Sequence, residues 1–357
     1  MNYVPFVSDM LKKHSVEFEM HQIDMEHKIR EEISSLRDER YEEFGYNYAK
    51  HNPFSAMREL LKGLTDKYRR ISKLEVAGCT VERRPVFAVH ISKAQSKTKP
   101  VILIECGIHA REWSAFEVCF YIISELLKQK TEKVQKLTSM YDFVILPALN
   151  PDGYVYSWTK DRMWRKNRSC DLPKEQCENI CIGVDINRNF DVNFYADDLL
   201  KMPCTEDYRG KSPFSERESQ VVKKIIKKLQ NRLLAYFCFH SFLSVWTFPW
   251  AKTKELPENY EEMERVAKVA TDTLQTMSNN TAYKTGSAAN MIYVVPGTSA
   301  DYAYDVGGAK YAFNVELRQG KEEKGGFIMS ESEIIPLCEE TFAALENCIL
   351  AMQPNRS

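Results

Sequence analysis

The stretch PVILIECGIHAREWSAFEV, from Pro100 to Val118, decides the fold of this chain. It starts as a continuous apolar run, turns at Gly107 and then takes on a helical pattern. Such a run is typical of a strand buried on both faces of a sheet. His109 and Glu112 follow the predicted strand three residues apart, so a helical turn would put both side chains on one face. Alone, the pair predicts either two metal ligands or an ordinary polar turn with a hydrogen-bonded histidine.

Similar apolar runs recur along the chain and alternate with helical patterns. The predicted strands are 85–92, 100–106, 141–149, 233–240 and 311–317, and the predicted helices are 25–41, 115–129, 218–230, 259–277 and 333–352. Ser215 and Glu218 form a capping-box pattern ahead of the third helix. The alternation predicts an α/β fold with a mixed, largely parallel central sheet and helices on both faces. Ligands of such sheets bind at the carboxyl ends of the strands.

Composition excludes several classes of protein. A chain of 357 residues with 44% hydrophobic side chains can build a substantial core, which excludes general disorder. A net charge of −1 creates no overall field that would attract nucleic acid or an anionic membrane. No apolar run approaches the roughly 20 residues of a membrane span, and the first residues lack the apolar region of a signal peptide. These absences are typical of a cytosolic protein, whereas ten cysteines, several of them in predicted loops, are typical of an oxidising compartment, so composition leaves the compartment open.

Two further strand ends carry polar side chains that change the interpretation of the first pair. His240 ends the apolar segment AYFCFH, and Glu316 is the last residue but one of YAFNVEL. Two histidines and one glutamate are a known catalytic zinc set that leaves the fourth tetrahedral position open. Glu316 has three readings: a fourth ligand, a general base held off the metal, or the partner of Arg318 in a surface ion pair.

Two basic loops and one turn complete the candidate site. Arg165 lies in DRMWRKNRS (161–169), and Asn187 and Arg188 lie in GVDINRNFD (183–191). Arginine binds a carboxylate with a bidentate fork that lysine does not reproduce. Tyr293 precedes a Pro-Gly turn, from which a phenol can swing onto a ligand.

From about Tyr41 onward, these motifs together resemble the A/B-type zinc metallocarboxypeptidases, the funnelin family. The matching motifs are HAREW, MWRK, DINRNFD, HSF, IYVVPGTSADY and NVELR. The resemblance implies one Zn²⁺ ion bound by His109, Glu112 and His240. It implies catalytic roles for Glu316 as general base and Arg165 as stabiliser of the oxyanion. It implies substrate contacts from Arg111, Asn187, Arg188 and Tyr293.

The activity that the resemblance implies is hydrolysis of the C-terminal peptide bond of peptides and proteins by a zinc-bound water. Ala300 occupies the family's selectivity position and cannot pair with a basic side chain, so we expect a preference for apolar or aromatic C-terminal residues. Thr247 and Asn314 are expected in the same pocket and are more polar than this preference suggests. Phe242 replaces a tyrosine of many relatives. The alternatives are a catalytically silent binding relative, which would lack a ligand or the base, and an enzyme with another C-terminal preference.

The front of the chain resembles only the end of an activation segment. We expect residues 1–40 to be its remnant, residues 41–357 to form the catalytic domain, and an activating protease to cut near Arg37 or Arg40. We further expect a secreted monomer whose signal peptide is missing through truncation and which acts on peptides with a free C-terminus, without nucleic acid or membrane partners.

The resemblance also implies disulfide bonds. It pairs Cys181 with Cys204, and Cys106 with Cys119. Cys170 and Cys177 are near enough in the sequence for a local bond, and the sequence leaves their pairing open. Cys238, within a predicted strand, is expected to be a buried thiol. Glycosylation patterns occur at Asn167, Asn279 and Asn355, although such short matches arise easily by chance.

Overall fold

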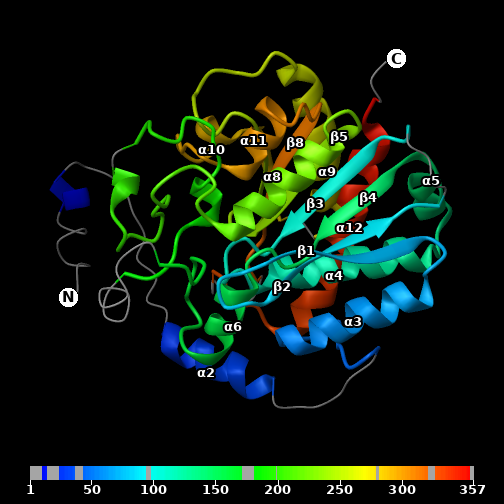
Figure 1. The fold of residues 1–357 in the computed structure, drawn as a ribbon, viewed down its shortest axis with the longest axis horizontal. Helices are drawn as coiled ribbons and strands as arrows, with labels where there is room; N and C mark the ends of the chain where they lie inside the picture. Colours follow the sequence, from blue (N-terminus) through cyan, green and yellow to red (C-terminus); the bar gives the residue numbers. More distant parts are fainter. Residues whose placement is uncertain are drawn as a thin grey trace.

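One eight-stranded sheet runs through the computed structural model, which describes residues 10–13, 24–36, 43–93, 98–170, 181–197, 199–278, 281–320 and 326–353. The strand order is β1-β2-β4-β3-β5-β8-β6-β7 (Figure 1). The strands are β1 (Ser72–Cys79), β2 (Pro85–Ile91), β3 (Val101–Cys106), β4 (Asp142–Leu146), β5 (Leu233–Ser241), β6 (Val245–Phe248), β7 (Lys284–Ser287) and β8 (Tyr311–Leu317). The inner strands β4, β3, β5 and β8 are parallel, whereas β1–β2, β2–β4 and β6–β8 pair antiparallel. The predicted mixed α/β sheet is confirmed.

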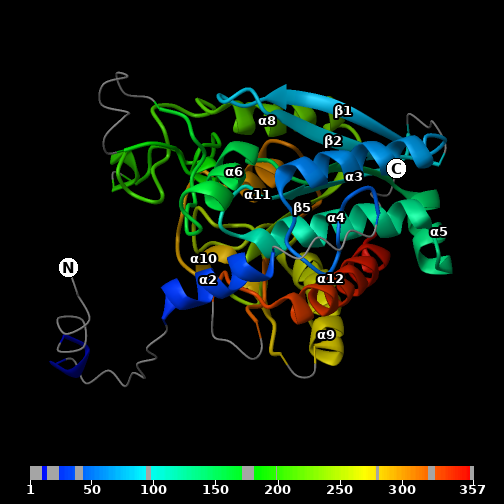
Figure 2. The same ribbon diagram turned by 90° about the horizontal axis from the view of Figure 1, so that it is seen from below.

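Helices cover both faces of this sheet (Figures 1 and 2). One face carries α3 (Phe54–Lys67), α4 (Trp113–Lys128), α5 (Glu132–Met140), α9 (Tyr260–Met277) and α12 (Glu331–Ala351), and the other carries α8 (Arg217–Leu229) and α11 (Ser299–Asp305). The other helices are α2 (Met25–Ser35), α6 (Pro151–Thr159), α10 (Ala288–Met291), η1 (Ile186–Arg188) and η2 (Leu199–Lys201). Among the described residues, none of these helices combines the length and apolar character needed to cross a bilayer.

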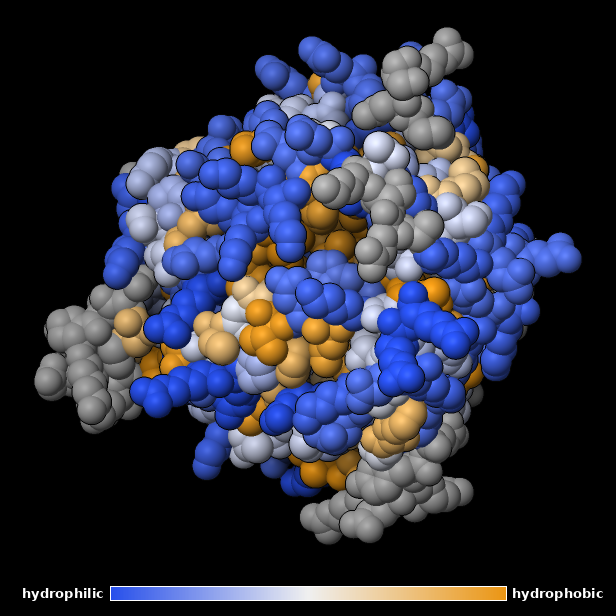
Figure 3. Space-filling view, turned by 45° about the vertical axis from the view of Figure 1, so that its right-hand side comes forward, coloured by the Kyte–Doolittle hydropathy of each residue, from blue (hydrophilic) through white to orange (hydrophobic). Residues whose placement is uncertain are grey.

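Strand β3 shows why the central strands read as continuous apolar runs. All six of its residues are buried. Ile102 and Ile104 pack into the cluster that contains α4 and α12, while Leu103 packs into the cluster that contains α8. Because side chains alternate between the faces of a strand, burial on both faces favours apolar residues throughout. The exception in β3 is Glu105, whose buried carboxylate accepts a hydrogen bond from the Tyr236 hydroxyl. Hydrophobic side chains also reach the surface locally, in a hollow ringed by hydrophilic ones (Figure 3).

The structure contains the predicted strands and helices with shifted ends, and it also contains several elements that were not predicted. All five predicted strands exist. Strands β1, β6 and β7 and helix α3 were not predicted; β6 and β7 have only four residues each, and β1 is half-buried throughout much of its length. The capping box was wrong: Glu216 is the N-cap of α8, and Ser215 Oγ instead donates to Glu216 Oε1 at 2.7 Å.

The cysteine predictions are largely confirmed. Disulfide bonds join Cys106 to Cys119 and Cys181 to Cys204, and Cys238 is a buried free thiol. Cys170 is disulfide-bonded, and Cys177, its candidate local partner, lies outside the described residues.

The glycosylation pattern at Asn167 is not usable in the folded chain. This side chain is fully buried, and its Nδ2 donates to Glu216 Oε2 at 2.6 Å. The other two patterns, at Asn279 and Asn355, lie outside the described residues.

Candidate active site

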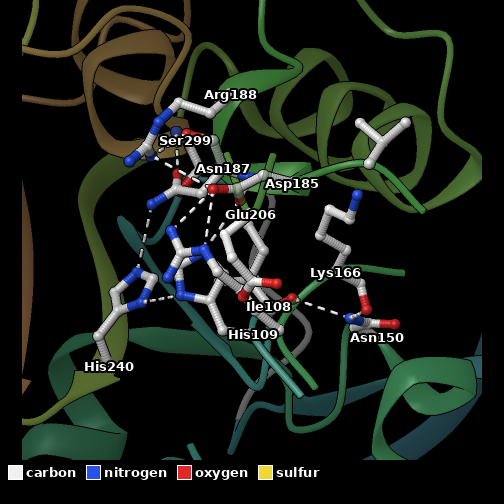
Figure 4. A network of polar contacts seen from close by, with 12 residues as sticks. Ile108, His109, Asn150, Lys166, Asp185, Asn187, Arg188, Glu206, His240 and Ser299 are labelled. Atoms are coloured by element: carbon white, nitrogen blue, oxygen red, sulfur yellow. Dashed lines mark hydrogen bonds and ion pairs between the residues drawn. The ribbon is translucent and has the colours of Figure 1, made fainter. Parts of the chain in front are cut away.

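A tight turn after β3 brings the first two candidate ligands to the carboxyl edge of the sheet. Gly107 has φ +69°, and a Cβ atom there would lie 2.4 Å from the Phe116 ring, so a side chain would strain both backbone and core. Asn150 Nδ2 donates to the carbonyl oxygen of Ile108 at 3.1 Å and holds the turn (Figure 4). Glu112 is the N-cap residue of α4, which begins immediately afterwards.

His109, Glu112 and His240 converge in a buried cluster. His109 Nδ1 lies 2.8 Å from Glu112 Oε1, and His240 Nδ1 lies 3.1 Å from both Glu112 Oε2 and His109 Nδ1. Ligands of a tetrahedral zinc ion, bound at about 2.0–2.1 Å, are roughly 3.3 Å apart. The nitrogen, nitrogen and oxygen donors therefore suit zinc in identity and spacing. This trio is the group of potential metal ligands found within the described part of the chain.

Asp185 contacts the ligand cluster through His109, and the sequence analysis did not predict this role. Its Oδ1 lies 3.0 Å from His109 Nε2 (Figure 4). Its Oδ2 accepts from Arg165 Nη2 at 2.7 Å. Burial alone would raise the pKa of Asp185, but the Arg165 and Arg188 cations outweigh it and hold the pKa well below its ordinary value. A carboxylate on the second ring nitrogen fixes the orientation of a metal-binding histidine. Its only signal was its place in DINRNFD, beside the residues chosen for carboxylate binding.

Glu316 lies beside the three ligands but takes no part in the contacts that join them to one another. It is opposite His240 in the parallel pairing of β5 with β8, and it lines the same cavity. Burial raises the pKa of Glu316 to about 7. The alternative surface pair with Arg318 is wrong, because Arg318 is buried and its Nε donates to Glu340 Oε1 at 2.6 Å.

The predicted carboxylate-binding residues meet at the cavity wall opposite the sheet edge. Arg188 Nη2 donates to the Tyr293 hydroxyl at 3.3 Å, and Asn187 Nδ2 lies 3.5 Å from His240 Nε2. Arg188 is buried, whereas Tyr293 is 57% exposed and has room to turn. Gly297 has φ +75° and packs against the Arg188 backbone, where a Cβ atom would lie 2.2 Å from the carbonyl oxygen.

Arg165 and Arg111 lie differently with respect to the cavity. Arg165 is among its lining residues, and its Nη1 lies 3.8 Å from Glu112 Oε1. Arg111 does not line it: its Nη1 donates to Glu206 Oε2 at 3.1 Å, and its guanidinium lies over the Phe327 ring, which does line the cavity. Arg111 therefore lies one layer farther from the metal ligands than the other candidates.

The cavity has a volume of about 220 Å³ and a largely apolar inner wall. Ala300, Asn314 and Phe242 line it, as do Phe248, Ala251, Ala288, Ile292 and Val295. Thr247, expected in this pocket, is not among the lining residues; it is fully buried and donates to the carbonyl oxygen of Asn314. Asp301 was not predicted here, and its carboxylate accepts the backbone N–H groups of Ala251 and Lys252 at 2.9–3.0 Å.

Comparison with known proteins decides the family. The zinc carboxypeptidase family model matches residues 57–344. The chain belongs to the zinc carboxypeptidase family. Mast cell carboxypeptidase A from Rattus norvegicus is 36% identical over 349 residues, which cover 95% of this chain and 80% of that protein. Carboxypeptidase B from the same species is 33% identical, covering 95% and 79%.

Solved structures agree with this assignment. The carboxypeptidase A from Helicoverpa armigera matches with a TM-score of 0.89 and 26% identity, covering 98% of this chain and 86% of that one. Thrombin activatable fibrinolysis inhibitor matches with a TM-score of 0.83 and 30% identity, covering 97% and 85%. The carboxypeptidase described here is therefore a metallopeptidase, and its relatives include both A-type and B-type enzymes.

Proposed function

We propose that this zinc carboxypeptidase removes apolar or aromatic residues from the C-terminus of peptides and proteins. The observation that supports it most strongly is the meeting of three groups in one cavity: the ligand trio of His109, Glu112 and His240, the carboxylate of Glu316, and the Arg188–Tyr293 pair. A binding relative without activity would lack a ligand or the base, and this chain has both.

The residues divide the reaction between them. Arg188, Asn187 and Tyr293 bind the terminal carboxylate of the substrate, which limits cleavage to the last peptide bond. A bound zinc ion supplies Lewis-acid activation of water and of the scissile carbonyl. Glu316 takes the proton of the attacking water and later donates it to the leaving amine. Arg165 stabilises negative charge on the carbonyl oxygen, a contribution often worth about 3 to 4 kcal/mol.

Specificity rests on the apolar part of the cavity. Ala300 is small and uncharged and leaves space for a large side chain. The Asp301 carboxylate is 1% exposed and already accepts backbone N–H groups, so it offers little to a basic substrate. Asn314 adds one polar group to an otherwise apolar surface.

The remaining assignments extend this proposal to the whole chain. We assign residues 1–40 to a remnant of an activation segment and residues 41–357 to the catalytic domain. The disulfide bonds Cys106–Cys119 and Cys181–Cys204 support secretion, and we further assign the enzyme as a monomer. The expected activating cuts near Arg37 and Arg40 lie outside the described residues.

The test measures zinc content and the release of C-terminal Phe, Leu, Lys and Glu from matched blocked dipeptides. We expect one bound zinc per chain and release of Phe and Leu well ahead of Lys and Glu. Protein that holds zinc but releases none of the four would overturn the activity, while fast release of Lys would overturn the pocket assignment alone.

A further inference from the structure

Helix α2 inserts a buried acid into the body of the enzyme. Glu32 is 7% exposed, and its two carboxylate oxygens face Arg162, with Oε2 2.5 Å from Nε and Oε1 3.1 Å from Nη2. His51 stands on the other side, with Nε2 3.7 Å from Glu32 Oε1. A buried carboxylate is stable only when it is paired and hydrogen-bonded, so this contact fixes α2 on the surface.

Arg162 connects Glu32 to the backbone of two residues that lie beside the cavity. The Arg162 guanidinium also donates to the carbonyl oxygens of Arg111 at 2.8 Å and Phe327 at 3.1 Å. It stacks on the Trp113 ring at 3.6 Å, directly after the ligand Glu112. The Arg162 side chain thus joins two backbone segments, at Arg111 and at Phe327, that are far apart in the sequence.

Those two segments lie beside the cavity, and we call the surface that Arg111 and Phe327 form there the groove. The Phe327 ring lines the cavity and packs edge-on against Phe242, with ring centroids 4.8 Å apart. The Arg111 guanidinium lies 4.6 Å from the centre of the Phe327 ring. Without Glu32, the Arg162 guanidinium loses two hydrogen bonds and the charge that balances it, so its position between the two carbonyl groups is held less firmly.

We propose that Glu32 is a positioning residue for substrate binding, acting through Arg162 on Arg111 and Phe327. The inference rests on the proposed function and on the substrate contact that the family resemblance implies for Arg111. In this role α2 supports the groove and does not obstruct it. No described residue of α2 lines the cavity at the metal ligands.

The test compares Glu32→Gln with Glu31→Gln, its exposed neighbour on the same helix. Each variant is assayed in the full chain with a blocked dipeptide and a blocked tetrapeptide ending in the same residue. For Glu32→Gln we expect KM for the tetrapeptide to rise about 5- to 10-fold with kcat within about twofold, and the dipeptide constants to stay near those of the parent. Glu31→Gln should match the parent with both substrates.

The outcomes separate this inference from the proposed function. Activity of the parent protein on the dipeptide tests the function by itself. Equal effects of Glu32→Gln on both substrates indicate a general loss of structure and overturn the positioning role, as does no effect on either. Should Glu32→Gln fail to fold, Arg162→Lys, which keeps the charge but loses the fork, must show the same length-dependent rise in KM.

Discussion

At the scale of single residues, the sequence predicts the three metal ligands of the site but does not predict Asp185, which contacts one of them. His109, Glu112 and His240 end or follow apolar strands, where a polar side chain stands out. Asp185 lies in a loop between Gly183 and Ile186, and nothing in the sequence distinguishes it from an acid on the surface. Its role depends on contacts across the fold, with His109 at 3.0 Å and with Arg165 at 2.7 Å. A one-dimensional pattern does not contain those contacts.

Replacing Asp185 with Asn should weaken zinc binding. The amide keeps the shape but removes the negative charge that orients His109 and balances Arg165. We expect zinc affinity to fall about 10- to 100-fold, the range seen for outer partners of metal ligands. Competition with a chelator measures it, and Asp191→Asn, an exposed acid in the same segment, is the control. Unchanged affinity in Asp185→Asn would show that Asp185 serves only Arg165.

Replacing Glu316 with Gln should separate metal binding from turnover. The residue lines the cavity without joining the ligand contacts, so zinc content should remain at the parent level. Loss of the base should lower kcat by about 100-fold or more. Metal analysis and peptide hydrolysis on the same sample measure both quantities. Retained turnover, with zinc bound, would remove Glu316 from the mechanism.

At the scale of secondary structure, predictability follows burial. Strands β3, β5 and β8 lie inside the sheet and read as apolar runs, so the sequence predicts them. Strand β1 lies at the sheet edge with a half-exposed pattern, and β7, at the other edge, has four residues. Edge strands keep polar side chains, and their apolar signal is weak. Helix α2 was predicted, but its buried Glu32 was not, because nothing in the local sequence separates it from Glu31.

Helix α2 should stay bound after the chain is cut behind it. Besides the Glu32–Arg162 pair, Lys50 Nζ donates to the carbonyl oxygen of Ser35 at 2.9 Å. We expect α2 to co-elute with the enzyme in gel filtration after cleavage at a protease site introduced between residues 36 and 43. Arg162→Ala should release α2, because the buried Glu32 carboxylate would lose its partner. An unpaired buried charge costs about 3 to 5 kcal/mol. Dissociation of α2 from the cut parent protein would refute this retention.

At the scale of the whole molecule, the site depends on strand order. The carboxyl ends of β3, β5 and β8 meet because these strands are neighbours, although 127 or more positions separate the residues of β3 from those of β5. The alternation of strands and helices predicts a parallel sheet and hence an edge where ligands collect. It does not predict which strands are adjacent. Adjacency is seen in the structure, where β3 pairs with β5 and His240 of β5 lies opposite Glu316 of β8.

The stability of the whole molecule should depend on pH through Glu218, which lies buried in the first turn of α8. Burial raises its pKa to about 8, with the nearby carboxylate of Glu216 acting in the same direction. The folded chain therefore keeps a proton that the unfolded chain releases above about pH 4.3. It follows that the free energy of unfolding declines as pH rises from that value towards 8.

Glu218→Gln should remove this loss of stability, because the amide carries no titrating proton. Its oxygen can still accept from Asn167 Nδ2, which lies 3.2 Å from Glu218 Oε2 in the parent. Relative to the parent protein, we expect the variant to gain about 2 to 4 kcal/mol in the free energy of unfolding between pH 5 and pH 8. Urea denaturation at both pH values measures this difference, with the exposed Glu261→Gln as control. A variant whose stability changes with pH as the parent's does would show that Glu218 is already ionised in the folded enzyme. The two buried carboxylates beside Asn167 would then have to share their site as anions.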